Sequence, residues 1–523
     1  MTGIGEALVA HLETHPARWP FEPCEGLTRI TTHSAWVLLS EHFALKIKKP
    51  VNFGFLDFST LSRRRACCEE ELRLNGRFAP ELYKGVVAFR QARGGFEIVD
   101  DPEDGEEFAV LMARFPQAAQ LDERLAAGTL APEQLRAFGA HWAARQADFE
   151  RAPEDGPWGT VDAVQKPVAA NFFHLWPKVA YLRDGAARLT GLEQQSVEEG
   201  AALASRFSGR LAQGYIREGH GDLHLKNLCA YQNSIQAFDC IDFSPQLRWI
   251  DTVSDLAFLF MDLRARGASR EAFSLLQGWL DGSGDHDGVA VLPYYVRYRA
   301  LVRAKVAALD LAQAAREARE DCVARLEAQV ALAEASLSTP ALVLLQGLSG
   351  SGKSYWGQRL GPALSALCLR SDIERKRLLG LAPEARPANS QERTSRYSPE
   401  MSARTYEHLQ YLAQQHLKSG FAVIVDATFL NPDALKAFGA LGERLRVPSV
   451  LVRCEAPEAV LRDRVRARES AASDPSDADE AVLEAQLRAK VSLPGAPAVV
   501  LTPETTEAVA VAAVKEALGF KGA

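Results

Sequence analysis

The sequence predicts a multidomain chain in which an α+β part is followed by an α/β part built on a parallel sheet. Three observations support this fold class. The length of 523 residues corresponds to three or four domain-sized units. Strand-like and helical segments surround a polar motif at residues 220–227. A glycine-rich loop at residues 347–354 lies between an apolar run and a helical pattern. The rest of the chain is organised around these two stretches.

Composition argues against several classes of protein. The chain is 47% hydrophobic and 24% charged, as in an ordinary globular protein. Its net charge of −7 gives no reason to expect broad attraction to nucleic acids or membranes. It contains no run of 18 apolar residues, no signal-peptide pattern and no C-x-x-C among its eight cysteines. We therefore expect a cytoplasmic protein with reduced cysteines and no nucleic-acid or membrane partner; the sequence does not predict an oligomeric state.

The first motif has the form H-x-D-x-x-x-x-N and is followed by a hairpin pattern that ends in Asp242. In phosphoryl transfer of the kinase type, one Asp accepts the proton of the acceptor hydroxyl, while an Asn and a second Asp hold Mg²⁺ against the phosphates. The spacing assigns these roles to Asp222, Asn227 and Asp242. The alternative is a polar turn between a helix and a hairpin.

Two strands, 36–39 and 43–48, precede this motif and are joined by a polar turn. Side chains alternate along a strand, so Lys46 and Lys48 share one face. A lysine on such a strand can contact the α- and β-phosphates of ATP. We expect Lys46 to do so, with Lys48 as the alternate and a solvated strand edge as the third interpretation.

The helix that follows should begin after a cap at Ser59-Thr60 and run to about Asn75. One of its glutamates should pair with the strand lysine. Glu71 is favoured, although its position is hardly distinguished from those of its neighbours Glu69 and Glu70.

A later helix opens with Asp251 and Asp255. These acids either brace the catalytic loop or simply favour the positive end of the helix dipole. The segment 291–305 is basic and aromatic, and is either a site for an anionic acceptor or a solvated helix face.

The second motif, G-x-x-x-x-G-K-S, is a Walker A loop in its usual context between a strand and a helix. Backbone N–H groups and the helix N-terminus should cradle phosphates, Lys353 should reach the β/γ oxygens, and Ser354 should ligate Mg²⁺. The nucleotide-binding residues expected here are Gly347, Ser349, Gly350, Ser351, Gly352, Lys353 and Ser354.

Polar residues at two predicted strand ends complete this second site. Asp372 belongs to the polar cluster that ends the expected strand 367–372 and is the expected proton acceptor, while Arg370 or Arg375 could hold an anion. Asp426 ends a buried strand and should support Mg²⁺ or its waters, as in a Walker B element.

An arginine-rich helix is expected near residue 465. Arg464 and Arg468 lie on one helix face because they are four residues apart. With the polar segment 473–479 behind them, they suit a mobile lid that closes on the transferring phosphate; a solvated helix is the alternative.

These motifs carry a resemblance to known families. Residues 1–338 resemble the aminoglycoside phosphotransferase and choline kinase branch of the protein-kinase-like fold, and residues 339–523 resemble the gluconate-kinase-like and zeta-toxin-like P-loop kinases. The pairing is similar to the bacterial bifunctional aminoglycoside phosphotransferase/ATP-binding proteins. It implies an N-lobe over 1–117, a helical C-lobe over 118–338 and a P-loop kinase domain over 339–523.

Two departures from the protein-kinase pattern argue for a small-molecule kinase. The run Thr31-Thr32-His33-Ser34 stands where a glycine-rich loop would cover the phosphates, and no long activation segment follows Asp242. We expect each half to transfer the γ-phosphoryl group of ATP, with Mg²⁺, to a hydroxyl of a small molecule. The alternative is a nucleotide-binding or nucleotide-hydrolysing regulatory or toxin-like stress protein.

Overall fold

The structure is a computed structural model that describes residues 3–52, 54, 56–471, 475–488 and 495–520. It divides into two compact units. Unit 1 comprises residues 1–130, 149–167 and 204–262, and unit 2 comprises residues 131–148, 168–203 and 263–523. The three-part division expected from the sequence stays a prediction.

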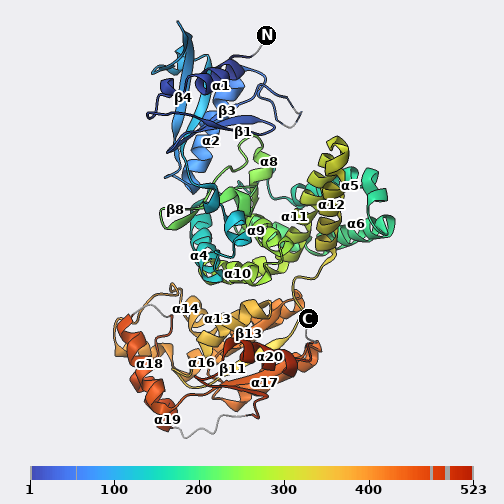
Figure 1. Cartoon of the computed structure of the whole chain (residues 1–523). Coiled ribbons are helices and arrows are strands. Elements are labelled where there is room, and N and C mark those ends of the chain that lie inside the picture. Colours follow the sequence, from blue (N-terminus) through green and yellow to red (C-terminus); the bar gives the residue numbers. More distant parts are fainter. Residues whose placement is uncertain (1–2, 53, 55, 472–474, 489–494, 521–523) are drawn as a thin grey trace. The chain divides into compact units, whose positions relative to one another are not determined.

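Unit 1 begins with a six-stranded antiparallel sheet of order β1-β2-β3-β6-β4-β5. Figure 1 draws this sheet in shades of blue, with β1, β3 and β4 labelled. Its strands are β1 (Thr28–Thr31), β2 (Ala35–Leu39), β3 (Phe43–Lys48), β4 (Tyr83–Ala92), β5 (Gly95–Val99) and β6 (Glu107–Ala113). Helices α1 (Ile4–Thr14) and α2 (Leu61–Phe78) pack on opposite faces of this sheet. The expected strands are confirmed. The cap expected at Ser59-Thr60 is also confirmed, because the Thr60 hydroxyl accepts a hydrogen bond from Arg63 N.

Alternation along β3 explains how the sheet presents its lysines. Leu45 and Ile47 lie in the apolar cluster on the α1 side, whereas Ala44 lies in the cluster on the α2 side. Lys46 and Lys48 share the face of Ala44 because they are two and four residues further along the strand. The strand therefore directs both ammonium groups toward α2.

The rest of unit 1 carries the catalytic-loop motif between small antiparallel strand pairs, β8 with β9 and β7 with β10. Its elements are α3 (Leu121–Ala126), α7 (Ala204–Ala212), β7 (Ile216–Glu218), β8 (Leu228–Tyr231), β9 (Ser234–Ala237), α8 (Pro245–Arg248) and β10 (Trp249–Asp251). Helices α5 (Val161–Leu175) and α9 (Thr252–Ala265) continue past the unit boundaries. In the two units together, short 3₁₀ helices lie at Pro16–Arg18, Pro102–Asp104, Gln117–Ala119, Trp176–Tyr181, Leu225–Asn227 and Arg316–Ala318.

Unit 2 contains a helical group and a parallel sheet. The helices of the group are α4 (Pro132–Asp148), α6 (Gly185–Ala202), α10 (Ser269–Ser283), α11 (His286–Gln313) and α12 (Arg319–Glu334). Glycines allow α4 and α10 to pack closely. A Cβ added at Gly278 would lie 1.9 Å from the carbonyl oxygen of Arg136, and one at Gly139 would lie 2.2 Å from that of Leu275.

The parallel sheet of unit 2 has five strands in the order β12-β13-β11-β14-β15 (Figure 1). They are β11 (Leu342–Gln346), β12 (Ala366–Arg370), β13 (Ala422–Asp426), β14 (Ser449–Cys454) and β15 (Val499–Leu501). The helices are α13 (Lys353–Ala363), α14 (Ser371–Leu378), α15 (Ser390–Arg396), α16 (Pro399–Lys418), α17 (Pro432–Leu445), α18 (Glu458–Ala471), α19 (Glu480–Arg488) and α20 (Glu507–Ala517).

Both faces of this sheet are buried, as its continuous apolar strands predict. Val343 and Leu345 of β11 pack with α13 and α20, while Leu342 and Leu344 pack with α16 and α17. This arrangement confirms the expected α/β fold. It also brings the carboxyl ends of β11, β12 and β13 to one edge, where ligands bind in open α/β sheets.

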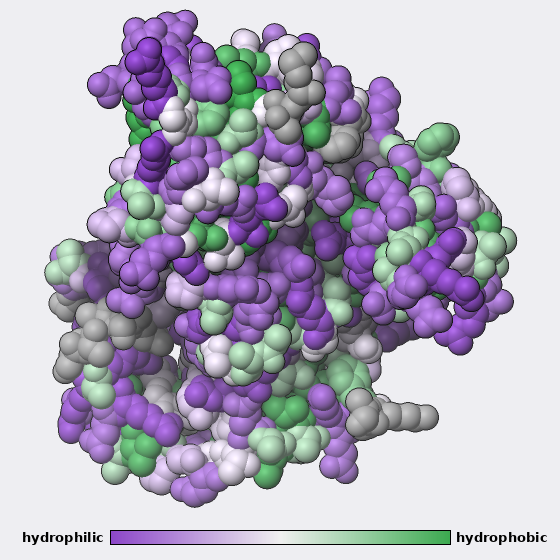
Figure 2. Space-filling view, turned by 45° about the horizontal axis from the view of Figure 1, so that its top comes forward, coloured by the Kyte–Doolittle hydropathy of each residue, from purple (hydrophilic) through white to green (hydrophobic). Residues whose placement is uncertain are grey.

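The surface is mainly polar on the face drawn in Figure 2, with apolar residues in small groups. No helix in the described ranges combines the length and the apolar composition that a membrane crossing needs.

Candidate phosphoryl-transfer sites

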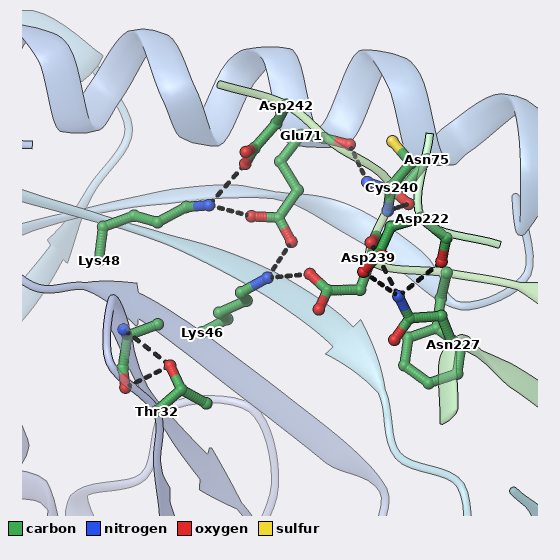
Figure 3. Close-up of polar contacts among 12 residues, drawn as sticks. Thr32, Lys46, Lys48, Glu71, Asn75, Asp222, Asn227, Asp239, Cys240 and Asp242 are labelled. Atoms are coloured by element: carbon green, nitrogen blue, oxygen red, sulfur yellow. Dashed lines mark hydrogen bonds and ion pairs between the residues drawn. The ribbon is translucent and has the colours of Figure 1, made fainter. Parts of the chain in front are cut away.

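The charged centre of unit 1 joins β3 to α2 (Figure 3). Lys46 Nζ lies 2.8 Å from Glu71 Oε1, and Lys48 Nζ lies 2.6 Å from Glu71 Oε2. Of the three glutamates left open by the sequence, Glu71 is therefore the one that contacts Lys46. Burial alone would lower the pKa of Lys46, but the carboxylates of Asp239 and Glu71 outweigh it and raise that pKa. Both ammonium groups stay charged.

The catalytic-loop motif brings Asp222 and Asn227 together. Asn227 Nδ2 donates to the carbonyl oxygen and to Oδ2 of Asp222, each at 3.0 Å, and approaches the carbonyl oxygen of Asp239 at 3.5 Å (Figure 3). His224 Nε2 lies 3.3 Å from Asp222 Oδ2. The Asp222 side chain is 37% exposed, so it can meet an acceptor.

Buried partners fix the shape of this loop. Asp255 accepts hydrogen bonds from the backbone N–H groups of His220 and Gly221, at 2.7 and 2.8 Å. Burial lowers the pKa of His220, so its neutral ring can donate from Nε2 to the carbonyl oxygen of Phe238 at 3.0 Å. Asp255 thus braces the loop, as one of the two sequence interpretations expects. Asp251 instead pairs with Arg210.

Two aspartates follow β9, and they differ in their environment. Asp242, the expected metal ligand, is 8% exposed and lies 2.7 Å from Lys48 Nζ and 3.2 Å from Cys67 Sγ. Asp239 is 51% exposed, and its Oδ1 lies 2.6 Å from Lys46 Nζ. Its φ of 58° is in the left-handed region, which is uncommon for a non-glycine residue.

Asp239 is a further candidate that the sequence analysis does not single out, since the sequence assigns the metal to Asp242, and that assignment stays a prediction. The sequence signal that could have pointed to Asp239 is its position just after the second strand of the hairpin.

Thr31-Thr32-His33-Ser34 forms a tight turn in which the Thr32 hydroxyl bonds to both the N–H and the carbonyl oxygen of Ala35.

The Walker loop of unit 2 links β11 to α13. Gly347, Gly350 and Gly352 have φ values of 155°, 83° and 98°, in the region that favours glycine. A Cβ at Gly350 would lie 2.7 Å from the carbonyl oxygen of Leu461, so the loop leaves no room for a side chain there. This geometry suits backbone approach to phosphates at the start of a helix.

Two polar side chains that follow the loop, Lys353 and Ser354, lie near the end of β13. Ser354 Oγ donates to Asp426 Oδ2 at 2.6 Å, and Lys353 Nζ donates to the carbonyl oxygen of Leu348 at 2.9 Å. Burial lowers the pKa of Lys353 and raises that of Asp426. Arg370 Nε lies 3.7 Å from Asp426. A phosphate that replaced the Leu348 carbonyl would give Lys353 an anionic partner.

A cavity of about 620 Å³ opens from this loop toward α14. Asp372, at the start of α14, lies in its wall and binds Arg375 Nη1 at 2.7 Å. Burial alone would raise the pKa of Asp372, but Arg375 and its other partners outweigh it and lower that pKa. Asp372 is therefore a carboxylate at neutral pH.

Helices α18 and α19 close the other side of the cavity. Arg464 and Arg468 both line it; Arg464 donates to the carbonyl oxygen of Gly350 at 3.2 Å and Arg468 to that of Ala478 at 2.8 Å. Gln486 of α19, which sequence reasoning missed, accepts a hydrogen bond from Ser349 N at 2.9 Å. Residues 473 and 474 of the expected lid lie outside the described residues.

The donor chemistry fits Mg²⁺, a hard cation that takes oxygen ligands and is usually held by one or two carboxylates together with phosphates. Asn227 and Asp239 offer such oxygens in unit 1, as do Ser354 and Asp426 in unit 2. No group of three or more His, Cys, Asp or Glu side chains is gathered for a metal within the described part of the chain.

The Walker loop and the five-stranded parallel sheet define a P-loop domain in the last part of the chain. Residues 342–492 match the family model described as AAA domain. Uncharacterized proteins of Mycobacterium tuberculosis and Mycobacterium bovis are each 29% identical to this chain over 458 residues, which is 87% of this chain and 89% of the relative.

Two solved structures are similar to different parts of the chain. A choline/ethanolamine kinase family protein from Mesorhizobium loti has a TM-score of 0.36 and 12% identity, and covers 62% of this chain and 99% of its own. The APS kinase of Mycobacterium tuberculosis, in complex with AMPPNP and APS, has a TM-score of 0.25 and 20% identity, and covers 35% of this chain and 99% of its own.

Proposed function

We propose that the chain is an ATP-dependent kinase with two independent sites, each transferring the γ-phosphoryl group of ATP to a hydroxyl of a small molecule. The observation that carries this proposal is that each site combines a lysine with an accessible carboxylate. In unit 1, Lys46 contacts Asp239, whose carbonyl oxygen lies near the Asn227 amide that bonds to Asp222. In unit 2, Lys353 and Asp372 line one cavity.

The chemistry is the same in both sites. The acceptor hydroxyl oxygen attacks the γ-phosphorus, the bond from that phosphorus to the bridging oxygen breaks, and ADP leaves. The hydroxyl proton passes to Asp222 or Asp372. Lys46 and Lys353 hold the phosphates, and Mg²⁺, when bound, neutralises their charge. Asn227 and Asp239 would hold the metal in unit 1, and Ser354 and Asp426 in unit 2.

The location of the site residues supports two sites rather than one composite site. All the residues of the first site belong to unit 1, and all those of the second belong to unit 2. Calorimetric titration with a non-hydrolysable ATP analogue and Mg²⁺ should give two nucleotides per chain. Lys353→Ala should leave one, and Asp222→Asn should leave both while abolishing transfer by the first site.

One nucleotide per wild-type chain, or none in Lys353→Ala, would contradict the two-site scheme. ATP turnover with water as the only acceptor would favour the regulatory alternative. A cytoplasmic location stays part of the proposal, as do a small-molecule partner and the domain division at 117/118 and 338/339.

A further inference from the structure

The cavity beside the Walker loop has a phosphate half and an acceptor half. The phosphate half contains the loop itself, Lys353 and the two arginines of α18. The acceptor half is defined here as the hydroxyl-bearing residues Ser371, Tyr397, Ser402, Tyr406, Thr428 and Ser476, together with Asp372 and Arg375. At about 620 Å³ in total, the cavity has the size of a small-molecule site.

The charges in the acceptor half compensate each other. Of these eight residues, Asp372 and Arg375 are the charged ones, and they form an ion pair of 2.7 Å. The Arg375 guanidinium also lies over the ring of Tyr397, 4.5 Å from its centroid. Arg375 is therefore held in part by the protein's own anion and aromatic ring, while its buried Nε has no hydrogen-bond partner among the residues that the structure describes. The sequence makes Arg375 a candidate to hold an acceptor's anion.

A charged acceptor would disturb this pair. An acceptor carboxylate or phosphate at Arg375 would lie beside Asp372, which already binds the same guanidinium, and like charges at such a distance repel. An ammonium group would bind Asp372 and occupy the oxygens that must accept the hydroxyl proton.

The hydroxyl groups suit an uncharged partner with many hydroxyls, because each of them can both donate and accept a hydrogen bond. Their positions are fixed by the protein. Tyr406 Oη accepts from Phe429 N at 2.9 Å and lies 3.3 Å from Thr428 Oγ1, while Tyr397 Oη donates to Asp372 at 3.3 Å.

We propose that the acceptor of the P-loop site is a small, uncharged, polyhydroxylated compound of the sugar or sugar-alcohol class. This inference rests on the proposed kinase function of the same site. Asp372 takes the proton from one of its hydroxyls, and the others bond to the hydroxyl side chains of the acceptor half.

The test uses matched acceptors with the full-length chain carrying Asp222→Asn, so that only the P-loop site transfers. D-glucitol, ribitol and D-glucose are each compared with the matching acid, which is gluconate, ribonate or glucuronate, and D-glucose also with glucosamine. We expect Mg²⁺-dependent transfer from ATP to at least one neutral compound, with kcat/KM at least tenfold above its charged counterpart.

A higher kcat/KM for an acid or for the amine overturns this inference and leaves the proposed kinase function standing. ATP hydrolysis without transfer to any of the compounds overturns the kinase function of this site, and this inference with it.

Two variants separate the roles by kinetics. Ser402→Ala should raise KM for the neutral acceptor several-fold with little change in kcat, because it removes one acceptor contact. Arg375→Met should lower kcat with KM within about twofold, because Arg375 acts on Asp372. A tenfold rise in KM with unchanged kcat in Arg375→Met marks Arg375 as a ligand of the acceptor and overturns the inference.

Discussion

Asp239 and Asp242 lie three residues apart but contact different lysines, and this difference assigns them different roles. Asp239 is half-exposed beside Lys46 and Asn227, whereas Asp242 is buried against Lys48. We therefore expect Asp239→Asn to weaken binding of the Mg²⁺–nucleotide complex in unit 1 by tenfold or more, about 1.4 kcal/mol. Calorimetry on a Lys353→Ala background isolates this site.

Asp242→Asn is the matched control for that measurement. It should change nucleotide affinity far less and lower the free energy of unfolding by up to about 3 kcal/mol, because Lys48 loses one of its two buried carboxylate partners. Urea denaturation measures the loss. The assignment is wrong if Asp242→Asn abolishes Mg²⁺-dependent binding and Asp239→Asn does not.

These two residues also show where sequence reasoning stops. The order of motif residues located Asp222 and Asn227, and strand alternation directed both Lys46 and Lys48 toward α2. The sequence could not separate two aspartates after one hairpin, because their roles depend on side-chain burial. Nor could it show that one carboxylate, Glu71, contacts both lysines.

A buried histidine in unit 2 predicts how stability depends on pH. Burial, followed by the neighbouring His286, lowers the pKa of His416 to about 3; Glu374, which also faces this pair, acts in the opposite direction. Between about pH 6.5 and 3 the unfolded chain binds a proton at this position that the folded chain does not. Folding stability should therefore fall as the pH decreases through this window, by up to about 1.4 kcal/mol per pH unit.

His416→Leu removes this proton and should reduce the loss of stability between pH 7 and pH 5. The free energy of unfolding in urea at the two pH values measures the effect. His33→Gln, at an exposed position, should leave the pH dependence of the wild type unchanged. An identical pH dependence in His416→Leu and the wild type would rule out a contribution from His416.

At the scale of elements, the contact between α4 and α10 depends on the absence of a side chain at Gly278. An added Cβ would lie 1.9 Å from the Arg136 carbonyl oxygen, so Gly278→Ala must push the two helices apart. We expect a loss of about 3 kcal/mol, as for overpacking of a tight core. Thermal or urea unfolding checks this.

Gly191→Ala provides the control within another helix of the same unit. Gly191 lies inside α6, and a Cβ there meets no atom within 4 Å. Alanine should raise stability by about 0.4–1 kcal/mol, because it restricts the unfolded chain. If the two substitutions had equal effects, close packing of α4 on α10 would not be the cause.

Elements with strong local signals were predictable, and those defined by distant contacts were not. The apolar strands of the parallel sheet were expected within a few residues of their positions, because both faces of each strand are buried. Helix α19 was missed: its Leu483 packs with Leu461 and Val465 of α18, and no local pattern reveals that contact.

At the scale of the whole molecule, a residue that precedes the P-loop motifs covers one edge of the P-loop sheet. Strand β12 is one of the two edge strands of this sheet, and Gln277 of α10 covers its edge within unit 2. The Gln277 amide donates to the Cys368 carbonyl oxygen at 3.0 Å and accepts from Cys368 N at 2.7 Å. It thus replaces one residue of a neighbouring strand. The sequence boundary near residue 339 therefore separates the P-loop motifs from a residue that completes their sheet.

We expect the separate fragment 339–523 to be less stable than the same residues in the full chain and to self-associate. Its β12 would present unpaired N–H and carbonyl groups, which readily pair with another strand. Gln277→Leu in the full chain should cost about 2–3 kcal/mol, since it leaves a buried donor and a buried acceptor unsatisfied; Gln313→Leu, at an exposed position of α11, should cost almost nothing. Sedimentation at several concentrations measures the self-association of the fragment. Urea unfolding measures the stability of the two variants, with loss of nucleotide-analogue binding as the signal for unfolding. A monomeric fragment as stable as the full chain, together with equal stability of the two glutamine variants, would show that the P-loop domain folds without α10.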